Sequence, residues 1–150
     1  MFSHILCPVD GSQPSMQALD VAAKLAAEQH ATLTICNVAD PAKASAMAFG
    51  DPGMSAACFE ALEAEAKTTV SEAAQRVRGT TAARTQTLDG PASGSILDCA
   101  VANACDLIVI GSHGRTGISR AIMGSVAEGV LRHSTVPVMV VHWTRTPAVA

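Results

Sequence analysis

Short apolar or β-branched runs alternate along the chain with longer segments in which apolar residues recur every three or four positions. The short runs predict strands over residues 4–9, 32–38, 83–88, 107–110 and 136–142. The longer segments predict helices from Pro14 to about Gln29, over residues 59–77, over residues 93–104, and in a last segment that ends near His133. Strict alternation is typical of a mainly parallel sheet with helices on both faces. We therefore expect an α/β fold built on a five-stranded parallel sheet.

The length of the chain fits one domain. It has 150 residues, of which 49% are hydrophobic, and this is enough to bury a core. No internal repeat and no long linker divides it, so we expect one domain over residues 1–150, with a core over about 2–143 and a tail over 144–150. Residues 40–53 contain two prolines, two glycines and small residues, which predicts a mobile loop near the site proposed below.

Composition argues against several kinds of partner. Aromatic residues make up only 3% of the chain, the net charge is −3, and no basic run occurs, so we expect no nucleic-acid partner. No apolar run approaches the ~18–20 residues of a membrane helix, and no signal peptide is visible, so we expect no membrane partner. The five cysteines are odd in number and form no C-x-x-C pair, which favours buried thiols in a reducing compartment. We expect a cytoplasmic protein.

A glycine-rich segment separates the apolar run 107–110 from the last helix. Gly111 and Gly114 are three positions apart, and Gly124 and Ser125 follow after nine further residues. Glycines let backbone N–H groups approach an anion, and a helix N-terminus adds unpaired donors, so this segment is a candidate phosphate loop. The alternative is that the glycines only turn the chain, since the segment matches neither a P-loop nor a dinucleotide fingerprint.

Other polar residues follow the first and second predicted strands. In a sheet of order 3-2-1-4-5, the strand order would reverse between the first and fourth strands, where ligands of such sheets bind. Asp10 would then share a crevice with the glycine segment and accept a hydrogen bond from a ribose hydroxyl or a base amine. Val38 would form an apolar wall for a base. The alternatives are that Asp10 caps the first helix, that Val38 belongs to the core, and that Ser125 caps the last helix.

Both ends of the chain resemble the universal stress protein family. The resemblance is carried by I-L-C-P-V-D-G-S over residues 5–12 and by residues 106–141, which include a complete G-x2-G-x9-G-S motif. It implies a five-stranded parallel sheet of order 3-2-1-4-5, a dimer, and bound ATP, or AMP or cyclic AMP in its place. By position it assigns nucleotide contacts to Pro8, Val9, Asp10, Val38, Ile110, Gly111, His113, Gly114, Gly124, Ser125, Val126 and Ala127.

Three functions remain open at this point. The first is a regulatory protein that binds an adenine nucleotide during stress. The second is a slow ATPase or phosphotransferase, which ranks lower because the glycine-rich segment has no P-loop lysine. We assign no catalytic residue and no protein metal site, and a need for Mg²⁺ stays open. The third is a nucleotide-free interaction module. We also expect a homodimer through residues 136–142, because an apolar edge strand is usually covered.

Overall fold

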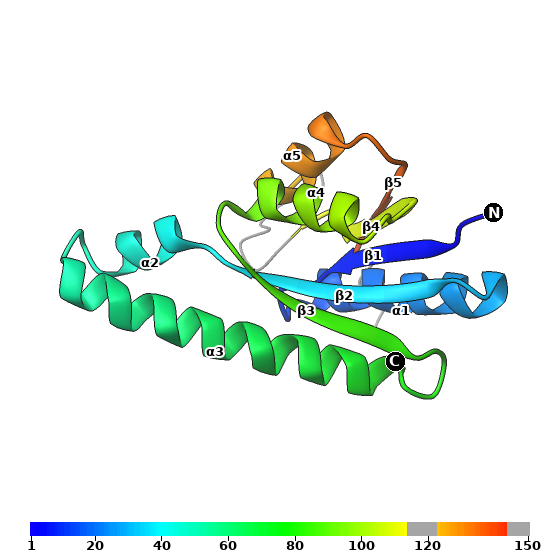
Figure 1. Ribbon diagram of the computed structural model, residues 1–150, viewed down its shortest axis with the longest axis horizontal. Helices are drawn as coiled ribbons and strands as arrows, with labels where there is room; N and C mark the ends of the chain where they lie inside the picture. The colour runs from blue at the N-terminus through cyan, green and yellow to red at the C-terminus, as the bar shows by residue number, and fades with distance from the viewer. Residues whose placement is uncertain (114–122, 144–150) are drawn as a thin grey trace, which may run out of the picture.

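The computed structural model describes residues 1–113 and 123–143. Its elements are β1 (His4–Pro8), α1 (Gln13–Gln29), β2 (Thr32–Ala39), α2 (Pro41–Met47), α3 (Pro52–Val77), β3 (Ala83–Asp89), α4 (Ala92–Ala102), β4 (Leu107–Gly111), α5 (Ser125–His133) and β5 (Val138–Val141) (Figure 1). The strands form one parallel sheet in the order β3-β2-β1-β4-β5. The predicted fold class and strand order are confirmed.

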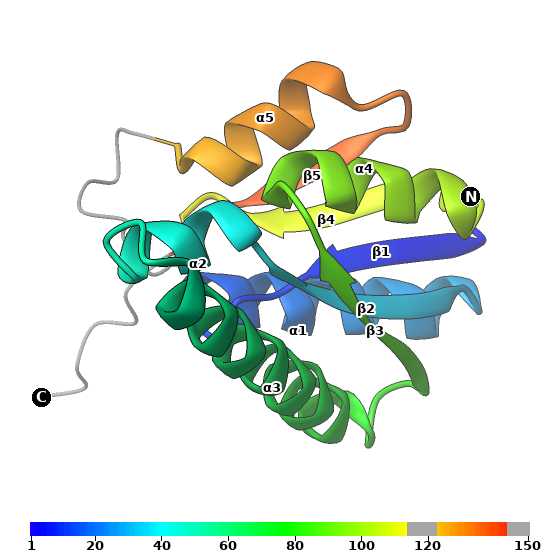
Figure 2. The same ribbon diagram turned by 60° about the vertical axis from the view of Figure 1, so that its left-hand side comes forward.

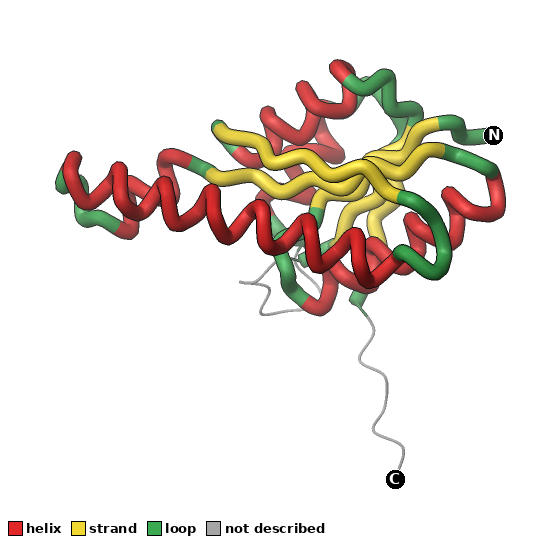
Figure 3. Tube along the Cα trace, turned by 60° about the horizontal axis from the view of Figure 1, so that its bottom comes forward, coloured by secondary structure: helices red, strands yellow, loops and turns green. Residues whose placement is uncertain are grey.

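The central strands β1 and β4 are buried on both faces: every residue except His4 is buried, and these buried residues are apolar. Along β1, Ile5 and Cys7 join the core under α1 and α3, whereas Leu6 joins the core under α4 and α5. On β4, Val109 and Ile108 divide between the two cores in the same way. Figures 2 and 3 show the sheet between these two pairs of helices. This packing explains why the central strands lack a polar face.

The strand order reverses at β1, which lies between β2 and β4. Five residue pairs join β1 to β2, from His4↔Thr32 to Pro8↔Cys36, and the Val9 N–H continues the contact by donating to the Cys36 carbonyl at 2.8 Å. Only two pairs, Ile5↔Leu107 and Leu6↔Ile108, join β1 to β4. The carboxyl end of β4 is therefore not paired to β1, and a crevice opens between their ends.

The prediction of a loop over residues 40–53 is wrong. Asp40 caps α2 by accepting a hydrogen bond from the Ala42 N–H at 2.8 Å, and Asp51 caps α3 through the Met54 N–H at 2.8 Å. Each aspartate precedes a proline, and an Asp-Pro pair can start a helix because proline is tolerated in the first turn. The two prolines therefore begin helices rather than mark a loop.

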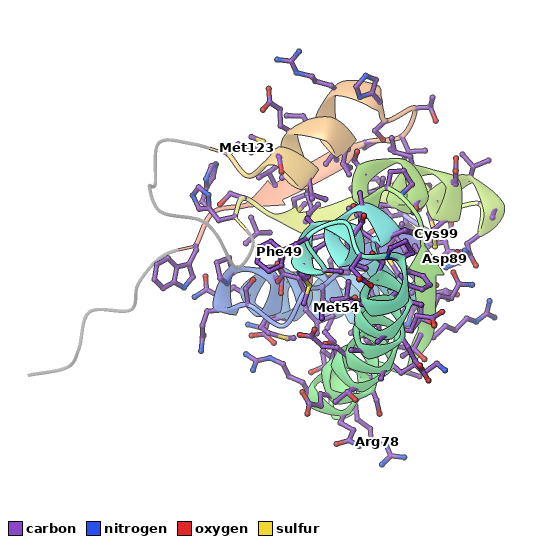
Figure 4. The ribbon with its side chains drawn as sticks, turned by 90° about the vertical axis from the view of Figure 1, so that its left-hand side faces the viewer. Phe49, Met54, Arg78, Asp89, Cys99 and Met123 are labelled. Atoms are coloured by element: carbon purple, nitrogen blue, oxygen red, sulfur yellow. The ribbon has the colours of Figure 1, made fainter. Side chains whose placement is uncertain are left out.

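Helices α2 and α3 form a hairpin that projects beyond the sheet (Figure 1). Ala39, Ala44 and Leu62 form a small core between the hairpin and the end of β2. Phe49 and Met54 lie at the hairpin's outer end, which faces the viewer in Figure 4, and Phe49 is 97% exposed. The hairpin is thus anchored at the carboxyl edge of the sheet, beside the crevice.

Two boundaries differ from the prediction at the other end of the fold. Helix α4 ends at Ala102, because Ala104 takes a left-handed conformation with φ 51°. Strand β5 begins at Val138, because a local turn engages Val136: its carbonyl accepts from the Ser134 hydroxyl at 2.7 Å. The expected tail, residues 144–150, lies outside the described residues. Within residues 1–113 and 123–143, no helix is both long and apolar enough to cross a membrane.

Candidate functional site

A cavity of about 370 Å³ lies at the carboxyl ends of β1, β2 and β4. Its volume is in the usual range of small-molecule pockets. All but one of the residues assigned from the sequence line it: Pro8, Val9, Asp10, Val38, Ile110, Gly111, His113, Gly124, Ser125, Val126 and Ala127. The exception, Gly114, lies outside the described residues. Positions far apart in the sequence are therefore brought together in the crevice where the strand order reverses.

The N-terminus of α5 forms one wall of the cavity. Gly124 is its N-cap residue, with φ −62° and ψ 150°, and as a glycine it has no side chain that could cap the helix. The Gly124 N–H donates to the Ser112 carbonyl at 2.7 Å, which fixes the start of α5 beside the end of β4. The N–H groups of Ser125, Val126 and Ala127 have no intrahelical partner, as in any first helical turn. This end of α5 suits an anion.

The first glycine of the motif has a packing role. A Cβ atom on Gly111 would lie 2.9 Å from the Pro14 carbonyl oxygen and 3.2 Å from the Ser15 nitrogen. Gly111 thus lets the end of β4 pass directly against the first turn of α1. The next residue, Ser112, is 2% exposed, and its hydroxyl has no hydrogen-bond partner in the part of the chain that the structure describes.

Asp10 is held at the cavity by the turn that follows β1. Its Oδ1 accepts hydrogen bonds from the backbone N–H and the hydroxyl of Ser12, at 2.9 Å and 2.5 Å, around Gly11 at φ 83°. Ser12, not Asp10, caps α1, since its hydroxyl accepts from the Ser15 N–H. The alternatives that Asp10 caps α1 and that Ser125 caps α5 are both wrong, because Ser12 and Gly124 take those positions.

Sequence reasoning missed about half of the lining residues. They come from the ends of β2 and α1 and from the helices around the crevice: Ser15, Cys36, Asn37, Asp40, Lys43, Leu62, Glu65, Ala66, Ala92 and Ile96. Asn37 has a visible role, because its side-chain Nδ2 donates to the Val9 carbonyl at 2.5 Å and joins the ends of β2 and β1. Its place at a strand end was the available signal. For Leu62 and Ala66, helical periodicity predicted that they lie on the buried face of a helix, but it did not show that this face borders the cavity.

The cavity is lined by both apolar and charged side chains. Val38, Leu62 and Ile96 line it beside β2, whereas the start of α5 lies beside β4. Charged groups on the described lining are the carboxylates of Asp10, Asp40 and Glu65, together with the Lys43 ammonium. No group of three or more metal-ligating side chains occurs among the residues that the structure describes. An apolar group packed on Val38, Leu62 and Ile96, together with an anion at the start of α5, would match this arrangement.

Together, the fold and the cavity define a parallel α/β protein with a ligand crevice where the strand order reverses. The family model of the universal stress proteins matches residues 1–142, and the chain belongs to that family.

Relatives of known name support this assignment. Universal stress protein A homolog 1 of Coxiella burnetii is 30% identical over 93% of this chain and 96% of its own length. Universal stress protein YxiE of Bacillus subtilis is 31% identical over 94% and 99% of the two chains. Among solved structures, universal stress protein UspA from Lactobacillus plantarum has a TM-score of 0.79 and 30% identity, covering 93% of this chain and 97% of that one.

Two more distant neighbours share the fold and were solved with nucleotides. A universal stress protein in complex with cAMP has a TM-score of 0.69 and 24% identity, over 95% of this chain and 99% of that one. The universal stress protein from Archaeoglobus fulgidus in complex with dAMP has a TM-score of 0.64 and 22% identity, over 93% and 97%.

Proposed function

We propose that this chain is a cytoplasmic regulatory protein of the stress response that binds an adenine nucleotide, with ATP as the first candidate and AMP or cyclic AMP as alternatives. The observation that carries the proposal is the meeting of Asp10 and the N-terminus of α5, with glycine as its N-cap, at one cavity. Fold neighbours solved with cAMP and dAMP support an adenine nucleotide as the ligand class. In this proposal the bound nucleotide changes how the protein engages its partners.

The polar groups and the apolar side chains of the lining have separate roles in the proposal. The first-turn N–H groups of α5, from Ser125 to Ala127, would hold the phosphates, because they are unpaired donors at the positive end of a helix. Asp10 would accept a hydrogen bond from the ribose. Val38 and Ile96 would pack against the base. Mg²⁺, where the phosphates need it, would arrive with the nucleotide.

The decisive experiment separates binding from stability at the start of α5. ATP at about 100 times its dissociation constant would add roughly 2.7 kcal/mol to the free energy of unfolding, provided that it binds only the folded chain. Gly124→Asp should abolish most of this thermal shift, since a carboxylate there would repel the phosphates at short range. The apo variant should not lose stability, because Gly124 has the extended conformation of an N-cap, where aspartate is preferred.

A matched control carries the same substitution far from the cavity. A Cβ on Gly79, beyond the end of α3, would meet nothing within 4 Å, so Gly79→Asp should keep the full ATP shift. Should Gly124→Asp also keep it, the start of α5 does not hold phosphates and the proposal fails. Asp10→Ala should weaken ATP binding but leave the binding of free triphosphate unchanged. A turnover near the enzyme median of ~10 per second would favour a phosphotransfer enzyme instead.

We also propose that two chains pair through β5. This strand forms one edge of the sheet, and its central side chain, Met139, is 37% exposed. Pairing would cover the backbone groups of that edge. Light scattering should show a dimer at micromolar concentration, and Met139→Lys, which places a charge on the edge, should weaken it. A monomeric wild-type chain would refute this assembly.

A further inference from the structure

Helix α3 brings a carboxylate to the cavity that the nucleotide contacts proposed above do not use. Leu62, Glu65 and Ala66 all line the cavity. Glu65 and Ala66 follow Leu62 by three and four positions, so the three side chains share one face of the helix. Leu62 and Ala66 are buried, whereas Glu65 is exposed. This face therefore places two apolar side chains inside the lining and the Glu65 carboxylate at its rim.

The helix that carries this carboxylate is packed against the end of β2. Leu62 joins Ala39 and Ala44 in the small core of the α2–α3 hairpin. Ala39 is the last residue of β2 and directly follows Val38, the side chain on which the base would pack. Glu65 is about one helical turn beyond Leu62 on the same face. A base on Val38 would therefore lie on the side of the cavity that Glu65 borders.

The phosphates would lie on a different side, at the start of α5. Figure 2 shows α3 and α5 on opposite sides of the strands, because α3 covers one face of the sheet with α1 and α5 covers the other with α4. The start of α5 is fixed beside the end of β4, and β1 separates β4 from β2. A nucleotide with its phosphates at α5 would thus extend across the end of β1 and direct its base toward β2 and α3.

The polar side chains on the β2 side of the cavity differ in what they can bind. Asn37 donates to the Val9 carbonyl, and Asp40 caps α2, so both have roles in the fold. Helices α2 and α3 add Lys43 and Glu65 to the lining. An ammonium group only donates hydrogen bonds, and an ionised carboxylate only accepts them. Of these two, Glu65 is therefore the group that can receive the hydrogens of an amino group.

We propose that Glu65 is a specificity-determining residue of the nucleotide site, and that its carboxylate accepts a hydrogen bond from the 6-amino group of adenine. This inference rests on the proposed function, because it requires a nucleotide whose phosphates lie at α5. It adds the group of the base that is recognised and the side chain that recognises it. The position also accounts for an acidic side chain in the site of an anion, since Glu65 faces the base and its repulsion of the phosphates falls with distance.

The test compares ATP with purine riboside triphosphate, which has the same sugar and phosphates but a hydrogen atom in place of the 6-amino group. Calorimetric titration gives the dissociation constants of both nucleotides for the wild type, Glu65→Ala and the control Glu63→Ala. Glu63 is an exposed carboxylate of the same helix that does not line the cavity. We expect the wild type and Glu63→Ala to prefer ATP by about tenfold, the low end for a hydrogen bond to a charged group, and Glu65→Ala to bind the two nucleotides equally.

The preference within one variant is the informative quantity. Removing a carboxylate changes the attraction of the protein for both triphosphates alike, so the ratio of the two dissociation constants cancels this general effect of charge. Glu65→Gln keeps an acceptor oxygen without the charge and should keep a smaller preference for ATP. Both glutamates are exposed on a helix, so alanine at either position should leave the melting temperature of the nucleotide-free protein nearly unchanged.

The outcomes separate this inference from the proposed function. If the wild type binds both triphosphates equally, or if Glu65→Ala retains the preference for ATP, the role of Glu65 is refuted while the phosphate site stands. If the wild type binds neither triphosphate, the proposed function fails and this inference fails with it. GTP is a further arm, because a carboxylate also accepts from the N–H and amino groups of guanine: tighter binding of GTP than of ATP would overturn the assignment to the 6-amino group.

Discussion

Replacing Ala104 by glycine should stabilise the protein, although an exchange of alanine for glycine usually destabilises a folded protein. Ala104 follows the C-cap of α4 and has φ 51°, in the left-handed region. Its N–H donates to the Val101 carbonyl at 3.0 Å, and the Cys105 N–H donates to the Ala100 carbonyl at 2.8 Å. These two bonds define a Schellman motif, in which the left-handed position is normally glycine.

The expected gain is a difference of two terms. A residue with a Cβ pays about 1–2 kcal/mol for the left-handed conformation, which glycine does not. Glycine also loses more backbone freedom on folding, which costs roughly 0.5–1 kcal/mol. The side chain of Ala104 is exposed, so no buried contact is lost. We therefore expect Ala104→Gly to raise the free energy of unfolding by about 0.5–1 kcal/mol, or about 2 °C in Tm for a chain of this size.

The control is the same exchange inside a helix. Ala61 is exposed in the middle of α3, so Ala61→Gly should lower the free energy of unfolding by about 1 kcal/mol. Urea denaturation of the wild type and both variants measures the two changes, with the slope of each transition checked for equality. If Ala104→Gly loses as much stability as Ala61→Gly, the chain does not hold residue 104 in a left-handed conformation, and the reasoning is refuted.

Two further predictions concern α1. Arg76 donates two hydrogen bonds to Asp20 and holds the pKa of that carboxyl below its ordinary value of 3.8. Since the pKa of Asp20 is lower in the folded state, the stabilisation is present above pH 3.8 and is lost as the pH falls through the folded-state value. Asp20→Asn should therefore lower the free energy of unfolding by about 0.2–1 kcal/mol at neutral pH, as expected of an exposed pair, and by less in acid. Urea denaturation at the two pH values measures the difference. Gly111→Ala should lower the free energy of unfolding by about 1–3 kcal/mol, because its Cβ would meet the Pro14 backbone at 2.9 Å. Gly79→Ala should change the free energy of unfolding by no more than about 0.5 kcal/mol. Equal melting curves for the two variants would contradict this packing.

The sequence predicted the fold correctly in segments whose residue pattern indicated only one kind of structure. The run over residues 107–110 is apolar at every position and is the buried strand β4. The stripe that contains Leu62, Ala66 and Val70 gave the buried face of α3. Over residues 40–53, two signals compete: proline and glycine suggest a loop, while Asp-Pro suggests a helix start. The aspartate caps decide the outcome, and they depend on hydrogen bonds that composition does not show.

The site shows a different limit of sequence reasoning. Residues at strand ends, such as Asp10 and Asn37, could be found because parallel strands bring their carboxyl ends to one edge. Lys43 and Glu65 could not, since they reach the cavity only through the α2–α3 hairpin.

The glycine motif itself combines two physical requirements. Gly111 is needed because β4 passes against the backbone of α1, a requirement that holds with or without a ligand. Gly124 has the extended conformation of an N-cap that any capping residue could adopt, yet glycine has no side chain that could accept from the first turn of α5. Glycine is a weaker choice than serine or aspartate for capping alone. In the function proposed above, phosphate groups bind at this helix start, so variants at residue 124, rather than at residue 111, are the ones that test the site.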